Sequence, residues 1–409
     1  MKKFFTVIAA VALAVVTAMP ATATESRLVA LGGAASYVED DFNIFDWPAT
    51  LPSYSNVLWM TVNSATWNGS DWVYEWEPLA LLGVSYGLGD DAQYGTLGLF
   101  FFHATSGLNP YGFGWPGANV FTGPIDNKFN LMYGYAMEGL SFGIYFSRAD
   151  EGFTYEEDET SEDHEAYTTI GAGVRFDAGD NAYADVGFDF SMASYKEEDT
   201  GWGDISNDAS TAIGVRGRLF YEWNETVTWV PYVNYQMYDF SLKADSAAYK
   251  DNFFGDKGMM IGFGVGANVT VNEDNLLIFA IEPFTYAKRE PSEAPTDMNY
   301  EFKRLTMPRF FLALESDIKD WLTFRVGAVK ELVKDESTTP GVAEDITVTD
   351  SYSRFNYFMG LGFHIGDFDI DCVLNNGLPY RLGYWLTGYQ PYDEIDSQPL
   401  YMVTGKYHF

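Results

Sequence analysis

The last nine residues of the chain fall on two faces of different character. One face carries Tyr401, Val403, Tyr407 and Phe409. The other face carries Met402, Thr404, Lys406 and His408. A repeat of two residues is the pattern of a β-strand whose faces meet different surroundings. We therefore predict a terminal strand, which needs neighbouring strands to satisfy its backbone hydrogen bonds.

The same alternation recurs in longer segments, at 170–176, 213–222, 259–269 and 354–365. In the first of them, four apolar residues face one way, and two glycines and Arg175 face the other. A soluble β-sandwich would also alternate, with its polar face in water and its apolar face in a core. Here the polar face is rich in glycine and isolated charges, whereas the apolar face carries large aromatic residues at its ends. This pattern favours a transmembrane β-barrel with its apolar face on lipid.

Composition agrees with a barrel and argues against other classes. Aromatic residues make up 17% of the chain, and 39 residues are Gly. Aromatic girdles and glycine-punctuated strands produce this profile in membrane barrels. The single cysteine, Cys372, excludes a disulfide framework and a Cys-based zinc site. We expect no metal, no cofactor and no enzymatic activity, because the four histidines are scattered and no nucleophile motif surrounds a serine.

The first residues have the pattern of an export signal. Lys2 and Lys3 precede an apolar run of about 15 residues, short of the ~20 that a spanning helix needs. Small residues at 21–23 suit a signal peptidase, so we predict a signal peptide over 1–23. Of the 24 basic residues two lie in this leader, which leaves 22 against 58 acidic ones and a net charge of −36. Such acidity argues against a nucleic-acid partner and fits an outer face that meets lipopolysaccharide through divalent cations.

Turn signals divide the remainder into strands. Short turns are predicted at 87–93, 137–139, 178–181, 224–225, 272–274, 317–320 and 366–367. Longer acid-rich loops are predicted at 67–71, 105–124, 152–165, 196–208, 244–254, 290–299, 335–350 and 376–398. Short turns on one side and long loops on the other are typical of outer-membrane barrels. We therefore predict an all-β fold over 57–409, a single antiparallel transmembrane barrel of about sixteen strands, with fourteen as the alternative.

The residues before the first strand, 24–56, do not alternate. They contain Ala-Leu-Gly-Gly-Ala at 30–34, three acidic residues at 39–41 and Trp-Pro-Ala at 47–49. This order resembles the N-terminal segment of FadL-type transporters. The resemblance implies a hatch that folds into the lumen, built with Gly32, Gly33, Asp40, Asp41 and Pro48. The alternative is a short periplasmic lead-in without a plug.

The terminal strand also resembles the C-terminal signal strand of Gram-negative outer-membrane proteins. In that family, a terminal Phe preceded by alternating apolar residues is read by the insertion machinery. The resemblance implies an outer-membrane location and a contact with the barrel-assembly machinery. It assigns the insertion signal to Tyr401, Val403, Tyr407 and Phe409.

Alternation places charges of both signs on the lumenal face. The predicted pore-lining residues are Arg175, Asp185, Asp189, Arg216, Arg218, Glu222, Glu282, Arg325, Arg354, Asp367, Asp369 and Asp371. Arg or Lys on the lipid face at the midplane costs about 2–4 kcal/mol, which favours the inward assignment. Opposed rows of Arg and carboxylate would orient and filter solutes in a water-filled pore. The alternative is that they pair with one another and brace the wall.

Three prolines, Pro231, Pro283 and Pro308, fall inside predicted strands between the ninth and the twelfth. A strand proline has no amide hydrogen for the ladder and marks a bulge or kink. In FadL-type proteins, a wall kink opens a lateral exit from lumen to lipid. A locally unpaired wall in this region is therefore one hypothesis, and ordinary bulges are the other.

Three functions fit these features. The first is a porin-like channel for small solutes, because a sixteen-stranded barrel is wide enough for water. The second is a FadL-type carrier of hydrophobic molecules with residues 24–56 as its hatch. The third is a structural or adhesive barrel whose acidic loops contact partners. The expected partners are outer-membrane lipid, lipopolysaccharide and small solutes, and a homo-oligomer stays open.

Overall fold

The structure is a computed structural model. It describes residues 25–63, 80–103, 128–156, 160–199, 205–207, 210–240, 243–244, 255–292, 301–339, 345–374 and 400–409. The predicted signal peptide and most of the predicted long loops lie outside these residues. Among the described residues, none of the helices has the length and apolar character needed to span a membrane.

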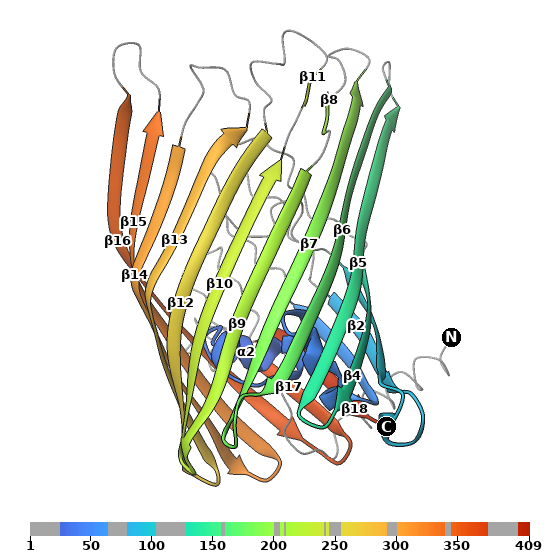
Figure 1. Cartoon of the computed structure of the whole chain (residues 1–409), viewed down its shortest axis with the longest axis vertical. Coiled ribbons are helices and arrows are strands. Elements are labelled where there is room, and N and C mark those ends of the chain that lie inside the picture. Colours follow the sequence, from blue (N-terminus) through green and yellow to red (C-terminus); the bar gives the residue numbers. More distant parts are fainter. Residues whose placement is uncertain are drawn as a thin grey trace, which may run out of the picture.

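Strands dominate the described chain (Figure 1). The first half of the wall is β1 (Val57–Asn63), β2 (Ala80–Gly87), β3 (Thr96–His103), β4 (Lys128–Met137), β5 (Leu140–Glu156), β6 (Thr160–Asp177), β7 (Ala182–Asp199) and β9 (Ser210–Asn224). The second half is β10 (Val227–Phe240), β12 (Gly255–Asn272), β13 (Asn275–Ser292), β14 (Glu301–Lys319), β15 (Leu322–Thr339), β16 (Ile346–His364), β17 (Phe368–Leu374) and β18 (Leu400–His408). The two-residue strands β8 (Ile205–Ser206) and β11 (Lys243–Ala244) pair with each other at the distal end of the barrel.

The sheet closes on itself without a free edge. Each strand pairs antiparallel with its neighbours, and β1 pairs with both β2 and β18. Eighteen strands form this sheet, and without the short β8 and β11 sixteen make the wall. The predicted all-β barrel of sixteen strands is confirmed, and the fourteen-strand alternative is not what the structure has. Closure gives the backbone N–H and C=O groups of every strand a partner, which is required in lipid because lipid offers no hydrogen bonds.

The outer face of the wall is an apolar belt. Large apolar side chains that point away from the lumen are exposed on strands all around the barrel, among them Leu82, Ile144, Val186, Phe263 and Leu312. A contiguous apolar surface of this kind is not found on a soluble monomer. Exposed aromatic residues edge the belt at the end with the short turns: Tyr86, Trp223, Trp321 and Phe409. The belt and its aromatic edge match a lipid-facing barrel wall.

Two predicted loops are shorter than expected. The predicted loop 152–165 is mostly strand, because β5 runs to Glu156 and β6 begins at Thr160. The predicted loop 335–350 is likewise reduced, since β15 runs to Thr339 and β16 begins at Ile346. The reason is physical: a ladder is made by backbone groups, so paired strands continue above the belt without apolar alternation. Acidic composition was therefore a poor marker of the strand ends.

The residues before β1 lie inside the barrel, near the end with the short turns (Figure 1). We call residues 25–56 the N-terminal segment. It contains α2 (Glu25–Ala30) and the 3₁₀ turns η1 (Ala35–Tyr37), η2 (Asp41–Phe45) and η3 (Pro48–Tyr54). A further 3₁₀ turn, η4 (Asp90–Ala92), lies between β2 and β3. Within the described ranges, two buried apolar clusters each combine residues of this segment with inward-facing residues of the wall.

Candidate functional site

The N-terminal segment crosses the lumen and contacts every strand of the wall. Helix α2 lies against β15 to β18, η1 against β10 and β12, and η3 against β2 to β6. Single groups reach the remaining strands, through Trp59 on β1, Gly187 on β7, Arg218 on β9, Glu282 on β13 and Glu315 on β14. The segment is therefore held from all sides.

Glycines of the wall make room for this segment. A Cβ atom at Gly173 would lie 2.9 Å from Pro48 Cδ, and one at Gly266 would lie 2.7 Å from Tyr37 Cδ1. At Gly143 a Cβ would overlap the carbonyl group of Pro48, and at Gly327 it would overlap the backbone at Leu31. The glycines that alternate along the inward face are thus sites of close approach by another backbone, which only glycine permits.

Local sequence shapes the path of the segment. Helix α2 ends where Gly32 and Gly33 both adopt a φ of 75°, a region that glycine occupies without cost. The Gly33 amide donates to the Leu28 carbonyl oxygen at 2.9 Å, which completes a helix end of the Schellman type. The Asp40 carboxylate accepts from the Phe42 amide at 2.9 Å and caps η2. Pro48 begins η3, a position where its missing amide hydrogen costs nothing.

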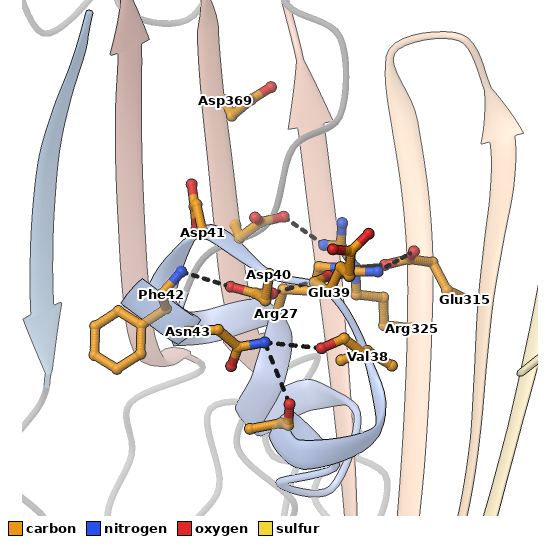
Figure 2. Close-up of polar contacts among 12 residues, drawn as sticks. Arg27, Val38, Glu39, Asp40, Asp41, Phe42, Asn43, Glu315, Arg325 and Asp369 are labelled. Carbon is orange, nitrogen blue, oxygen red and sulfur yellow. Dashed lines mark hydrogen bonds and ion pairs between the residues drawn. The ribbon is translucent and has the colours of Figure 1, made fainter. Parts of the chain in front are cut away.

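Arg27 joins the segment to the wall (Figure 2). Its Nε and Nη2 atoms donate to the two carboxylate oxygens of Glu315 at 2.6 and 2.8 Å. Its Nη1 atom donates to Asp40 Oδ2 at 3.1 Å. Glu315 is shared with Arg325, whose Nε lies 2.5 Å from Oε2, and Arg325 also pairs with Asp371. The paired, fork-shaped geometry of arginine suits such a site because both carboxylate oxygens are satisfied.

A second centre holds the segment to the last strand. The ammonium group of Lys406 lies 2.5 Å from Asp41 Oδ2 and 3.7 Å from Asp369 Oδ2. The indole of Trp59 donates to the same oxygen of Asp41 at 3.2 Å. His408 lies 3.2 Å from Asp369. The two carboxylates beside Lys406, Asp41 and Asp369, come from distant parts of the chain, so this centre forms only when the segment lies inside the barrel.

Asp40 and Asp41 are adjacent and both buried. Burial and the neighbouring charge of Asp41 raise the pKa of the Asp40 carboxyl well above its usual range. The two cations, Arg27 for Asp40 and Lys406 for Asp41, oppose this effect. Removal of either cation would leave one of the two buried carboxylates without its counter-ion, which is destabilising.

A third centre lies against β6, β7 and β9. Arg175 makes two hydrogen bonds to Asp185, at 2.7 and 2.9 Å, and an ion pair with Glu39 of the segment at 2.7 Å. Arg218 donates to Asp185 at 2.9 Å. Its guanidinium group lies over the Trp47 ring, 4.5 Å from the centroid. Trp47 thus supplies an aromatic face for an arginine.

Two further contacts complete this side. Arg218 donates to the Val38 carbonyl oxygen at 3.0 Å, so a wall arginine binds the backbone of the segment. Arg216 pairs with Asp46 of the segment and with Asp189 of the wall. The two arginines therefore hold the segment at both ends of η2.

A fourth centre lies beside the prolines. The Tyr37 hydroxyl donates to Glu282 at 3.1 Å, and Arg309 pairs with the other oxygen of Glu282 at 3.2 Å. Arg309 also donates to Glu331, at 2.9 and 3.0 Å. Arg354 lies 3.7 Å from Glu331, with a half-exposed side chain. Tyr37 is thus the only described group of the segment that bonds into this charged strip of the wall.

The predicted pore-lining residues fall into three groups. Nine of them are paired in these centres or beside them: Arg175, Asp185, Asp189, Arg216, Arg218, Glu282, Arg325, Asp369 and Asp371. Arg354 is the exposed member of the fourth centre. Glu222 is exposed at the end of β9, beside the 178–181 turn, and Asp367 lies in the turn between β16 and β17. Asp367 is therefore not on a wall strand with Asp369 and Asp371, because β17 begins one residue after it, at Phe368.

The residues predicted as the insertion signal lie on β18, except for Phe409, which follows it. Val403 pairs with Cys372 and with Val62 of the neighbouring strands. The centroid of the Tyr407 ring lies 4.5 Å from that of the Phe368 ring and 6.3 Å from that of the Phe409 ring. The side chain of Tyr401 lies outside the described residues. These contacts place the C-terminal aromatic residues at the edge of the apolar belt.

One group of residues has the order of a hydrolase triad. Thr323 Oγ1 lies 2.8 Å from His364 Nε2, and His364 Nδ1 lies 3.2 Å from Asp369. Thr323, however, is 0% exposed, and its hydroxyl bonds to Asp317 as well. A nucleophile needs access to its substrate and a base that takes its proton. The group is therefore better explained as part of the buried polar packing of the wall.

Sequence reasoning missed one member of several of these contacts. It did not predict as site residues Arg27, Tyr37, Glu39, Trp47, Arg309, Glu315, Glu331 or Lys406. For the wall residues a signal was present, since alternation places Arg309, Glu315 and Lys406 on the inward face. For the segment no periodic signal exists, because its turns present side chains in all directions.

Comparison with known proteins gives a likeness in structure only. The sequence matches no family model and no curated protein. The structure is similar to the CymD monoaromatic hydrocarbon channel, with a TM-score of 0.40 and 11% identity over 97% of this chain and 98% of that chain. It is similar to a Pseudomonas aeruginosa FadL homologue, with a TM-score of 0.43 and 11% identity over 96% and 100%.

A third similar structure is the Pseudomonas putida toluene transporter TodX, with a TM-score of 0.37 and 11% identity over 96% of this chain and 100% of that chain. The strand pairing by itself makes the chain a closed sixteen-stranded β-barrel with a segment clamped in its lumen.

Proposed function

We propose that this protein is an outer-membrane carrier of small hydrophobic molecules and that the N-terminal segment is its hatch. The observation that carries the proposal is the clamp: the segment contacts all the strands and is tied to the wall by ion pairs, of which Lys406–Asp41 is fully buried. An aqueous porin needs its lumenal charges free to face water. Here nine of the twelve predicted charges are paired with the segment or with other wall residues, so the porin-like channel is the weaker reading.

The wall offers a route that avoids the blocked axis. Between the pairs Glu282–Arg309 and Thr285–Thr306, residues 283–284 of β13 and 307–308 of β14 do not pair with each other. The neighbouring ladders also shift there, between β12 and β13 and between β14 and β15. Pro283 and Pro308 have no amide hydrogen to donate, which accounts for the break. In this proposal, an apolar molecule leaves the lumen through this part of the wall into lipid.

The lumen beside the segment suits an apolar ligand. Phe45 of the segment packs against Phe100 and Phe102 of β3, with ring centroids 5.0 and 5.3 Å apart, and against Phe42 at 5.1 Å. Phe45 and Phe102 are only partly buried. Aromatic side chains gathered on a concave wall are the usual lining of a site for small apolar molecules. A small neutral aromatic compound is therefore the natural first probe.

The test combines conductance with uptake. The protein without residues 1–23 is refolded and recorded in a planar bilayer, as the wild type and as Arg27→Met/Lys406→Met. The wild type should show no stable open steps, and the double variant should open because two clamps of the segment are lost. Cells that express the wild type should take up radiolabelled toluene faster than cells without it.

The matched control is Lys330→Met/Arg354→Met, which removes the same charge from exposed or half-exposed positions. It should leave the wild-type conductance unchanged. Stable open steps in the folded wild type would overturn the hatch and restore the porin. Absent toluene uptake would overturn the hydrophobic cargo, and a silent barrel without uptake would favour a structural or adhesive role.

A further inference from the structure

Lys128 is a lumenal cation without a carboxylate partner among the described residues. It is the first residue of β4 and shares the inward face with Asn130 and Met132. In the part of the chain that the structure describes, no acidic group pairs with its ammonium, which lies 5.0 Å from the centroid of the Phe102 ring. The arginines of the four centres and Lys406 all have carboxylates. A partly buried ammonium without a counter-ion is costly unless something else neutralises it.

Two polar side chains next to Lys128 also lack partners. Asn130 and Ser147 face each other across β4 and β5, and they are 4% and 2% exposed. The Asn130 Oδ1 and Ser147 Oγ atoms make no hydrogen bond. On the next two strands, β6 and β7, the corresponding polar side chains are paired: the hydroxyls of Thr169 and Ser191 lie 2.9 Å apart and hydrogen-bond to each other. Buried polar atoms are nearly always paired, so two adjacent exceptions call for a missing partner.

An apolar surface completes the site. Phe102 pairs with Lys128 across β3 and β4, and its ring packs against Phe45 of the N-terminal segment. The side chains at 128 and 130 point the same way along β4, since residues two apart share a face. An ammonium, an amide, a hydroxyl and aromatic rings therefore meet on one part of the inner wall.

We propose that this group is a binding site for a small aromatic carboxylate. The ammonium of Lys128 and the hydroxyl of Ser147 donate to the carboxylate. The Asn130 amide, whose orientation follows its hydrogen bonds, turns its NH₂ group toward it. The ring of the ligand packs against Phe102 and Phe45. This assignment rests on the proposed function and narrows its cargo, because it adds an anionic head to an apolar body.

Binding of an anion at this site depends on the positive charge of Lys128. With a formal net charge of −34 for the whole chain, the protein repels anions at long range. A carboxylate is held only where a local cation lies within hydrogen-bonding reach. A hydrogen bond to a charged group contributes more than one between neutral groups.

The experiment measures the affinities of benzoate and of its neutral counterpart, benzyl alcohol, for the folded full barrel by calorimetry. The wild type should prefer benzoate, and Lys128→Met should lower that preference by about tenfold or more. Asn130→Asp keeps the shape of the side chain and gives Lys128 an internal counter-ion, so it should have the same effect. Lys334→Met, on the exposed outer face of β15, is the control and should preserve the preference.

Benzoate that binds the wild type no better than benzyl alcohol, or a preference that survives both Lys128→Met and Asn130→Asp, would overturn this site. If Lys128→Met fails to fold, Asn130→Asp decides alone. The two proposals fail separately: toluene uptake by the wild type with no preference for benzoate rejects only the carboxylate site. Absent toluene uptake rejects the neutral cargo and leaves the benzoate measurement readable.

Discussion

Two parts of the barrel wall are built differently. Strands β5 and β6 pair residue by residue from Leu140 with Phe176 to Glu156 with Thr160, and β6 and β7 continue without a shift. Strands β13 and β14 instead do not pair with each other at 283–284 and 307–308. Where the segment lies on the regular wall the inward residues are Gly143 and Gly173, whereas beside the break they are Glu282 and Arg309.

This difference decides how each wall meets the N-terminal segment. On the regular wall, the backbone of η3 lies directly on Gly143 and Gly173. On the broken wall, the Tyr37 side chain reaches Glu282 by one hydrogen bond. Backbone contact at a glycine cannot shift without a large movement, whereas a single side-chain bond can rotate away. The segment therefore rests on the backbone of β5 and β6 at these glycines, whereas beside the break in β13 and β14 the bond to the wall is made by the Tyr37 side chain.

The largest expected effect concerns a buried ion pair of the wall rather than either kind of contact with the segment. Arg325→Met leaves the buried carboxylates of Glu315 and Asp371 without their shared cation. Losing one partner of a buried pair should lower the free energy of unfolding by about 3–5 kcal/mol. Urea unfolding of the protein in lipid vesicles measures it.

The control for this variant is Arg354→Met, whose side chain is 49% exposed and whose pair with Glu331 is 3.7 Å long. A pair of this kind contributes about 0–1 kcal/mol. Equal losses in the two variants would show that the buried clamp is no stronger than an exposed ion pair.

A smaller effect is expected on the regular wall. Gly143→Val places side-chain atoms where the Pro48 carbonyl lies, so η3 must move. Overpacking should cost about 1–3 kcal/mol and expose the segment to proteases. The measurement is the rate of proteolytic cleavage within 25–56. Gly217→Val, on the lipid face where a Cβ meets only Val233 at 3.5 Å and a backbone oxygen at 3.9 Å, is the matched control, and faster cleavage in both would refute the anchoring role.

The smallest expected effect concerns the broken wall. Pro283→Val restores an amide hydrogen at the interrupted ladder, and one added hydrogen bond contributes about 0.5–1.5 kcal/mol. If apolar cargo leaves there, toluene uptake should fall about two- to tenfold, with the conductance unchanged. Pro231→Val in β10 is the comparison variant, at a break in the β9–β10 pairing. Unchanged uptake in Pro283→Val would remove the lateral exit.

Much of the fold could be read from the sequence because its rule is local. A two-residue period assigns each side chain to one face of its strand, and Arg175, Arg218 and Arg325 do face inward. The strand ends were less well predicted. Asp367 continues the spacing of Asp369 and Asp371 and yet lies in a turn, because spacing does not say where pairing stops.

The site itself could be predicted only in part. The Gly-Gly-Ala order and the acidic residues drew attention to the N-terminal segment, but nothing in its turns indicated which wall charge each side chain would meet. Lys406 and Asp41 are 365 residues apart, and Arg27 and Glu315 are 288 apart. Such partners meet only when the first and last strands close the barrel.

By itself, the sequence determined a barrel with an apolar outer face and a charged, glycine-rich inner face, because alternation is a property of neighbouring residues. The tertiary structure decided what the inner face does. It brought the N-terminal segment against those glycines and paired most of the charges with it or with each other. It left Lys128 without a counter-ion among the residues that the structure describes. That outcome depends on strand register and on distances between remote residues, which no local pattern records.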